Sequence, residues 1–235
     1  SFSSRMVIKL LKKKKNEEYK NLPQTLADID MLGYKHVSVV SINIFPTDEH
    51  EVLKKIVDGF KHFSLANISC TNALLTKTKE TTAFLKDLNE QISKDDTANL
   101  YVIHGTPRLD TVGIDSISYS ASFLELISEN NFTCSLEGAF PYFEINDVIK
   151  SRIEKLGLKK VQVVPLLLVS GNHYIEDMFE IKDDLSDKFE SFIVPSLTKS
   201  EKFNLIELPM IQNIIEKNIQ NTFKMMGISH KEITY

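Results

Sequence analysis

The sequence predicts an α/β protein built from two related half-domains, each a mainly parallel sheet flanked by helices, with a cleft between them. Apolar runs of strand length alternate with segments of helical periodicity along the chain, which is the pattern of βαβ units. Residues 161–169 form a nearly continuous apolar run, typical of a strand buried on both faces of a parallel sheet. An internal repeat is the third observation.

The repeat relates residues 32–40 to residues 156–164. At an offset of 124 residues, LGYKHVSVV and LGLKKVQVV are identical at six of nine positions. In both copies a glycine follows a helical segment and precedes a Val-rich strand, and the same offset relates Glu49 to His173. We interpret the copies as related halves. The alternative is that any junction of a helix with a buried strand needs a glycine and a Val-rich run.

In the first half, residues 1–95, helical and strand patterns alternate. A short amphipathic helix over residues 6–15 ends in four lysines, which we interpret as a solvated helix end rather than a nucleic-acid patch. A second helix starts near Pro23 and ends at Gly33. The other expected elements are a strand over 36–45, a helix after His50, a strand around 65–68 and a helix over 80–92.

The second half, residues 96–235, continues the alternation. Besides the strand over 161–169, strands are expected over 99–103, 132–136 and 191–195. Helices are expected over 117–127, 145–156 and 210–226, and residues 179–189 are helical or irregular. The C-terminal helix could pack back on the first half.

The composition is that of an ordinary globular protein, with 42% hydrophobic and 26% charged residues. A net charge of −4 leaves no basic excess for phosphates, so no nucleic-acid partner is expected, and no apolar run is long enough to span a membrane. Cys70 and Cys134 lack CxxC spacing, which supports neither a disulfide framework nor a thiolate zinc site. We expect a cytoplasmic protein, although a chain without an initiator Met gives little information on export signals.

Three polar residues follow apolar strands and stand beside or near a glycine, namely His104, Glu137 and His173. Because open α/β sheets bind ligands beyond the carboxyl ends of their strands, these side chains could meet on one rim. Two imidazoles and a carboxylate suit Co²⁺, Fe²⁺, Ni²⁺ or Zn²⁺ better than Mg²⁺ or Ca²⁺. A neutral imidazole could also accept a proton from a substrate nitrogen. The alternative for each residue is a polar loop position without a function.

Several common catalytic motifs are absent from the chain. It has no HExxH, Walker A or paired CxxC pattern, and no GxGxxG opens a helix, so neither a nucleotide nor a dinucleotide site is expected. The residues around Ser170 do not form a GxSxG elbow, which leaves a serine hydrolase without support.

Three stretches together resemble the anaerobic sirohydrochlorin cobaltochelatase family, the class II chelatases akin to ferrochelatase. They are HGT at 104–106, SLEGAFP at 135–141 and VVPLLLVSGNHYIEDM at 163–178. The corresponding family stretches are a GHGT box, an E-G-x-P stretch and a P-L-M-L-V-A-G-D-H-x-x-N-D-M segment. FSSRMVI at 2–8 and IFPTDE at 44–49 are similar to its FTS-x-x-I and I-x-P-G-x-E stretches.

The resemblance implies a two-half chelatase fold that binds a tetrapyrrole in its cleft. It implies an ATP-independent lyase of cobalamin biosynthesis that inserts a divalent metal, Co²⁺ before Fe²⁺ or Ni²⁺, into sirohydrochlorin and releases two protons. His104 and His173 would be metal ligands, and Glu137 would be a third ligand or a proton acceptor. Glu49 and Gly171 would face the tetrapyrrole. A homo-oligomer is compatible with this reading.

The chain also departs from the family pattern. Ile103 replaces the first glycine of the GHGT box, Thr47 replaces a glycine and Asn172 replaces an aspartate. The first strand of the family, with an SFGTS motif, and the helix after it are expected before Phe2, so either the sequence is incomplete or the protein is a truncated relative. These departures motivate an alternative, a non-catalytic relative that binds the tetrapyrrole or the metal. A third hypothesis, a receptor for a small solute, rests on the two-half layout alone.

Overall fold

The computed structural model describes residues 8–9, 12–13, 16, 18–169, 171 and 176–228. Contacts between Cα atoms divide the chain into two units. The first unit contains Ser1–Asn43, Asp48–Ala73 and Ile215–Tyr235, and the second contains Ile44–Thr47 and Leu74–Ile214. Each unit is an α/β structure with a parallel sheet, which confirms the predicted fold class.

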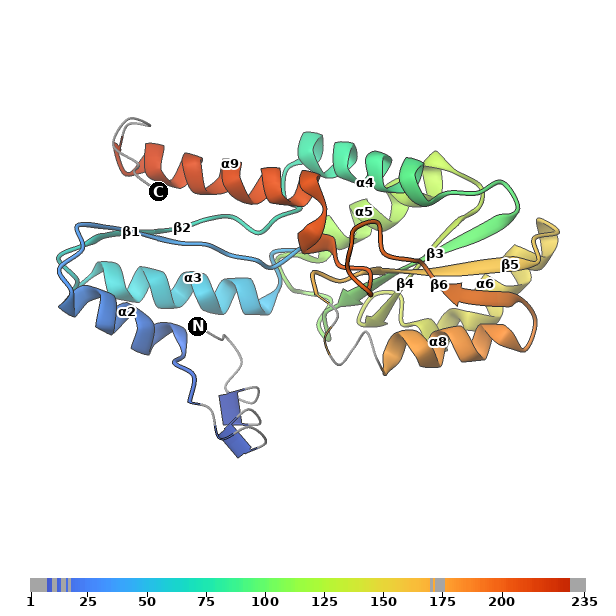
Figure 1. Ribbon diagram of the computed structural model, residues 1–235, viewed down its shortest axis with the longest axis horizontal. Helices are drawn as coiled ribbons and strands as arrows, with labels where there is room; N and C mark the ends of the chain where they lie inside the picture. Colours follow the sequence, from blue (N-terminus) through green and yellow to red (C-terminus); the bar gives the residue numbers. More distant parts are fainter. Residues whose placement is uncertain are drawn as a thin grey trace. The chain divides into compact units, whose positions relative to one another are not determined.

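The first unit holds a two-stranded parallel sheet, β1 (His36–Val39) and β2 (Asn67–Cys70). Helices α2 (Leu22–Met31) and α3 (Asp48–Lys61) lie on one side of the strands, and the C-terminal part of α9 (Pro209–Met225) lies on the other (Figure 1). The core of this unit is aliphatic. Its buried members are Leu22, Leu26, Val37, Val39, Val57, Ala66 and Ile68.

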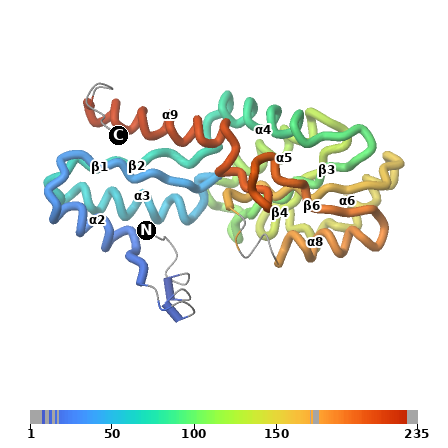
Figure 2. The backbone as a smooth tube through the Cα atoms, viewed as in Figure 1, coloured from blue at the N-terminus to red at the C-terminus, as the bar shows by residue number. Residues whose placement is uncertain are grey.

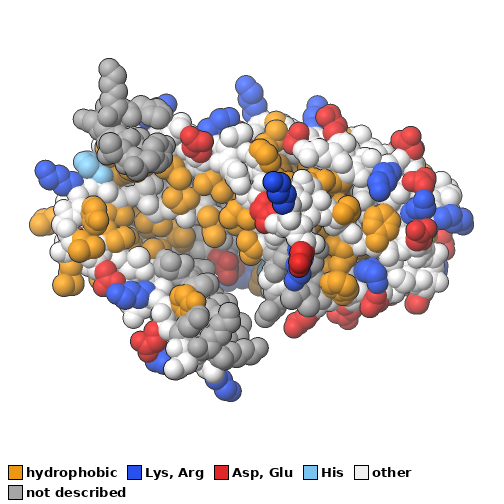
Figure 3. Space-filling model, viewed as in Figure 1, with side chains coloured by type: hydrophobic (Ala, Val, Ile, Leu, Met, Phe, Trp, Pro, Cys, Tyr) orange, Lys and Arg blue, Asp and Glu red, His pale blue; other side chains and the backbone are white. Residues whose placement is uncertain are grey.

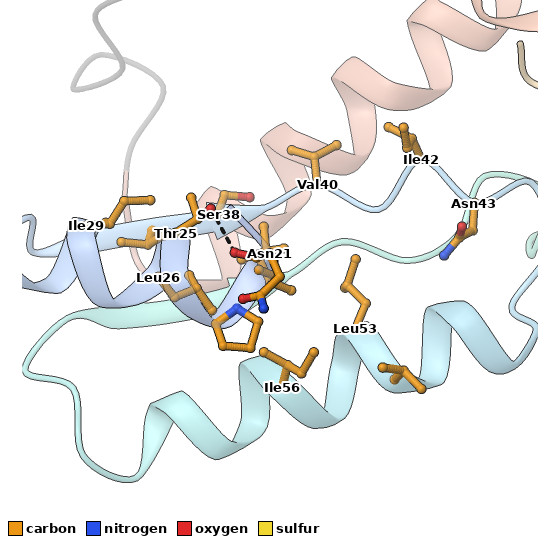
Figure 4. A pocket seen from close by; sticks show the side chains of 15 residues that line it. Asn21, Thr25, Leu26, Ile29, Ser38, Val40, Ile42, Asn43, Leu53 and Ile56 are labelled. Atoms are coloured by element: carbon orange, nitrogen blue, oxygen red, sulfur yellow. Dashed lines mark hydrogen bonds between the residues drawn. The ribbon is translucent and has the colours of Figure 1, made fainter. Parts of the chain in front are cut away.

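An apolar pocket of about 670 Å³ opens between α2, β1 and α3. Figure 4 shows Leu53 and Ile56 of α3 and Leu26 of α2 around it. The Ser38 hydroxyl lies in this pocket and is buried without a hydrogen-bond partner, the single side-chain atom of that kind in the described part of the chain. None of the residues selected from the sequence as functional candidates lines the pocket.

The second unit holds a four-stranded parallel sheet in the order β4-β3-β5-β6. Its strands are β3 (Thr97–Gly105), β4 (Asn131–Glu137), β5 (Lys160–Leu166) and β6 (Glu190–Ile193). Its helices are α4 (Thr78–Ile92), α5 (Ile114–Ile127), α6 (Tyr142–Lys155) and α8 (Asp177–Ser186), and a short 3₁₀ turn, η1 (Leu205–Glu207), precedes α9. Helices α4 and α5 cover one face of the sheet, and α6 and α8 cover the other (Figures 1 and 2).

The internal repeat has the same local structure in both units. Leu32 and Leu156 end their helices with nearly identical backbone angles, φ −77° and ψ −7° against φ −79° and ψ −6°. Gly33 and Gly157 follow with φ of 74° and 73°, a left-handed conformation that glycine adopts readily. Strands β1 and β5 then begin at the same offset of 124 residues. Within the described residues β5 is paired on both edges, whereas β1 is paired only with β2.

Among the elements whose positions differ from the expected ones, three are informative. Strand β1 ends at Val39 rather than at residue 45, because the next backbone N–H groups leave the sheet, that of Ser41 donating to the Thr71 hydroxyl at 2.8 Å. Strand β2 begins after Leu65, whose side chain is fully exposed. Helix α4, expected in the first half, groups with the second unit. The Asn89 side chain of α4 accepts hydrogen bonds there from buried polar groups of β3 and β4.

Apolar side chains are visible on the surface of the first unit, at the left of Figure 3. The most exposed large apolar residues between α2 and β2 lie at or just after the C-terminal ends of the two helices. They are Met31, Leu32, Tyr34, Phe63 and Leu65. Among the described helices, none has the length and apolar character needed to cross a membrane.

Candidate metal site at the ends of parallel strands

His104 and Glu137 lie side by side at the carboxyl ends of two neighbouring strands. Strands β3 and β4 are parallel and pair up to Gly105 and Glu137. His104 Nδ1 lies 3.7 Å from Glu137 Oε1, and both side chains are about half exposed, at 46% and 45%. The structure therefore brings together two of the three residues that the sequence placed at strand ends.

The sheet topology gives this edge a special position. The connection after β3 runs through α5 on one face, and the connection after β5 runs through α8 on the other. The crevice between two strands whose connections diverge in this way is where open α/β sheets bind ligands. His104 is at the end of β3 and thus beside the diverging strands, which pair from Thr97–Lys160 to Ile103–Leu166.

Glycine follows each of the two candidate residues, and each glycine has a left-handed backbone, with φ of 82° at Gly105 and 89° at Gly138. The two backbones come very close here. A Cβ atom at Gly105 would lie 1.9 Å from the carbonyl oxygen of Glu137, and one at Gly138 would lie 1.9 Å from that of Thr106. Neither position accepts a larger residue without movement of the opposite strand.

The turn that follows Glu137 is closed by hydrogen bonds to the buried residue Ser135. The Ser135 N–H donates to the Phe140 carbonyl at 2.7 Å, and the Phe140 N–H donates to the Ser135 hydroxyl at 3.2 Å. Ser135 itself is fully buried in β4. These two hydrogen bonds hold the turn on both sides of Glu137, so the position of its backbone is well determined.

His173 lies outside the described residues, so its expected place beside His104 is untested. Gly171 is exposed, and its N–H donates to the Val169 carbonyl at 2.9 Å. Glu49 is exposed in the first turn of α3, in the first unit, whereas His104 and Glu137 belong to the second. Among the described residues no three His, Cys, Asp or Glu side chains are grouped closely enough to hold a metal ion.

A buried histidine in the first unit was not selected from the sequence. His50 of α3 is only 3% exposed, and its Nδ1 lies 2.8 Å from the hydroxyl of Ser41, which is itself fully buried. Burial lowers the pKa of His50, which favours the neutral ring. Its spacing from Leu53 and Val57 places it on the apolar face of α3, and that periodicity was the signal available.

The two cysteines have no role at this edge. Cys70 is partly buried in the first unit, and Cys134 is fully buried within β4. Burial raises the pKa of both thiols, that of Cys70 to about 11. Among the described residues, the imidazole of His104 and the carboxylate of Glu137 are the exposed metal-binding groups at this edge.

Comparison with known proteins shows that the chain is similar to chelatases. The family model for cobalt chelatase (CbiK) matches residues 1–224. The sirohydrochlorin cobaltochelatase of Salmonella typhimurium is 21% identical over 180 residues, which cover 76% of this chain and 65% of that protein. The chain thus spans slightly less than two thirds of the length of this relative.

Solved structures of chelatases share the fold. SirB from Bacillus subtilis with Fe³⁺ superimposes with a TM-score of 0.63 at 15% identity, covering 89% of this chain and 81% of SirB. The sirohydrochlorin chelatase SirB from Bacillus subtilis subspecies spizizenii in complex with cobalt has a TM-score of 0.56 at 15% identity, with coverage of 88% and 78%. DR2241 from Deinococcus radiodurans, a multi-domain protein with structural similarity to chelatases, has a TM-score of 0.56 at 12% identity and coverage of 92% and 50%.

Proposed function

Because the chain belongs to the cobalt chelatase (CbiK) family, we propose that it inserts a divalent metal ion into sirohydrochlorin. The reaction exchanges two pyrrole protons for one M²⁺ ion, forms nitrogen–metal bonds and uses no ATP. The curated relative named sirohydrochlorin cobaltochelatase and the sirohydrochlorin chelatase SirB in complex with cobalt support this substrate. The observation that carries the proposal is the pair formed by His104 and Glu137 at 3.7 Å.

In the proposed mechanism, His104 and His173 bind the incoming metal ion through neutral imidazole nitrogens. Glu137 is the third ligand or accepts a pyrrole proton, and its half-exposed carboxylate can pass that proton to water. Imidazole and carboxylate together hold a late divalent ion without the very tight binding of thiolates, so the ion can be transferred to the macrocycle nitrogens. Glu49 and Gly171 are proposed to face the tetrapyrrole.

Co²⁺ is the metal that we propose, on the basis of the family and of the cobalt complex of SirB. The ligand set itself accepts Fe²⁺ and Ni²⁺ as well. Nitrogen and oxygen ligands bind all late divalent ions with affinities that follow one general order, so they do not select a single metal. Parallel assays with the three ions under anaerobic conditions will decide which one is turned over fastest.

The test is metal insertion followed by the absorbance change of sirohydrochlorin. The variants His104→Ala, Glu137→Gln and His173→Ala should each lose most of the rate, in the range of about 10²-fold or more expected for a lost proton-transfer group or ligand. His62→Ala, which removes an exposed histidine after α3 in the first unit, is the matched control and should keep the wild-type rate.

Two outcomes would contradict the proposal in different ways. Wild-type rates in all three variants would remove the assignment of the ligands. Tight binding of sirohydrochlorin by the wild-type protein, without insertion of Co²⁺, Fe²⁺ or Ni²⁺, would instead indicate a tetrapyrrole-binding relative that has lost turnover.

A further inference from the structure

Gly105 and Gly138 differ from the other left-handed glycines of the chain. Gly33, Gly157 and Gly227 also have positive φ, between 73° and 77°, but a Cβ atom built on any of them would meet nothing within 4 Å. At those three positions the backbone angle alone accounts for glycine. At Gly105 and Gly138 glycine is required for a second reason, because the neighbouring backbone occupies the space that a side chain would need.

The two close approaches are reciprocal. Gly105 of β3 faces the carbonyl oxygen of Glu137, and Gly138 at the end of β4 faces the carbonyl oxygen of Thr106, each with 1.9 Å between a built Cβ and that oxygen. A side chain on either strand would therefore push the other strand away at the same place. Ordinary van der Waals contact begins at about 3.4 Å, so one methyl group requires a displacement of roughly 1.5 Å.

This displacement falls on the candidate ligands themselves. The carbonyl that a Cβ at Gly105 would meet is that of Glu137 itself, and the one that a Cβ at Gly138 would meet is that of Thr106, two residues after His104. Because His104 immediately precedes Gly105 and Glu137 immediately precedes Gly138, the displacement falls on the backbone next to both side chains. Ligand distances in metal sites fall within about 0.2 Å of standard values. A shift several times larger would separate the imidazole from the carboxylate, now 3.7 Å apart.

We propose that Gly105 and Gly138 are positioning residues for metal binding, which hold His104 and Glu137 at chelating distance by permitting this contact between backbones. The inference rests on the proposed function only in taking these two side chains as metal ligands. In this proposal both glycines act through His104 and Glu137 rather than as ligands, since glycine has no side chain.

The experiment compares Gly105→Ala and Gly138→Ala with Gly157→Ala in the intact chain. Gly157 lies in the same unit with a similar φ but with open space around it, so this control introduces the backbone strain without the collision. Co²⁺ binding is measured by calorimetry and by the visible absorption of the ion, and folding is checked by circular dichroism. Gly105→Ala and Gly138→Ala should weaken Co²⁺ binding by roughly tenfold or more, as for lost supporting groups of metal ligands. Gly157→Ala should leave the affinity unchanged.

A double-mutant cycle separates positioning from a general structural effect. In a Glu137→Ala background the ligand pair is already broken, so adding Gly105→Ala should reduce Co²⁺ affinity clearly less than it does in the wild-type background. The same loss in both backgrounds would overturn the proposal. So would wild-type affinity in both glycine variants, or failure of both to fold, which would make the glycines determinants of the fold as a whole.

Failure of this inference and failure of the proposed function give different results. If the wild-type protein inserts Co²⁺ into sirohydrochlorin and the glycine variants bind Co²⁺ equally well, the inference falls and the function stands. If the wild-type protein binds Co²⁺ in a glycine-dependent manner but inserts no metal, the function falls and the positioning role stands.

Discussion

Lys150 of α6 and Asp184 of α8 form an ion pair in which Nζ lies 2.8 Å from Oδ2. The Tyr142 hydroxyl donates to the same carboxylate oxygen at 2.7 Å. The Lys150 side chain is only 8% exposed and that of Asp184 is 26% exposed. Helix α6 follows Glu137 in the chain, and α8 follows the segment that contains His173. The ion pair therefore joins the two helices that come directly after two of the proposed ligands.

The first prediction concerns this ion pair. Asp184→Asn should lower the free energy of unfolding by about 3 kcal/mol, because it leaves the Lys150 ammonium buried without a counter-charge. Urea denaturation measures the loss. The matched control is Asp183→Asn, since Asp183 is 71% exposed and pairs with Lys182 on the surface; it should cost less than about 1 kcal/mol. Equal effects of the two substitutions would show that burial of the pair does not matter.

The second prediction is a pH dependence of stability due to His50. Burial lowers its pKa below the usual 6.5, with a further lowering from Lys54 opposed by Glu51. His50 has its usual pKa in the unfolded chain and a lowered pKa in the folded protein, so between these two values the unfolded chain binds more protons than the folded one. The contribution of the neutral His50 ring to folding stability is therefore complete above about pH 6.5 and is lost as the pH falls toward the lowered pKa. His50→Asn, which can keep the contact with the Ser41 hydroxyl, should flatten this part of the stability curve.

The measurement is the urea midpoint at several pH values between about 7 and 5. His62→Asn replaces an exposed histidine just after α3 and should leave the slope as in the wild type. A slope that persists in the His50→Asn variant and disappears in the His62→Asn variant would assign the titration to the exposed ring instead.

The third prediction uses the internal repeat. Gly33→Ala and Gly157→Ala should each cost about 1 kcal/mol, because both glycines have positive φ and neither has an atom within 4 Å of a built Cβ. Asn at either position should cost less, since its side chain tolerates this conformation. Thermal unfolding of the four variants gives the comparison. A much larger loss at one glycine than at the other would mean that the two junctions are not equivalent.

The fourth prediction concerns Ser135, whose hydroxyl accepts from the Phe140 N–H in the turn around Glu137. Ser135→Ala should cost about 1–2 kcal/mol, because that N–H loses its partner within a partly buried turn. It should also weaken Co²⁺ binding severalfold if Glu137 is a ligand. Ser120→Ala is the control, since the Ser120 hydroxyl donates only to the Ser116 carbonyl within α5. Similar Co²⁺ affinities for the two variants would show that the turn held by Ser135 does not contribute to metal binding.

The fold class and the local pattern around the site could be predicted from the amino-acid sequence. Apolar residues that recur with a period of about 3.6 or 2 residues indicate which face of each helix or strand is buried. The repeat at an offset of 124 residues is found by aligning the sequence with itself. The strand-end positions of His104 and Glu137 followed from the apolar runs before them, because an apolar run stops where the chain leaves the core. The resemblance to chelatases rested on contiguous boxes around the same residues.

Contacts between segments far apart in the sequence could be established only from the tertiary structure. The 3.7 Å separation of His104 and Glu137 and the close backbone contact at Gly105 depend on the pairing of β3 with β4, which no local pattern specifies. The buried pair of Lys150 with Asp184 looks like two surface charges in the sequence. Hydrophobic burial is recorded residue by residue along a chain, whereas strand order, register and the pairing of buried polar groups are properties of the assembled core.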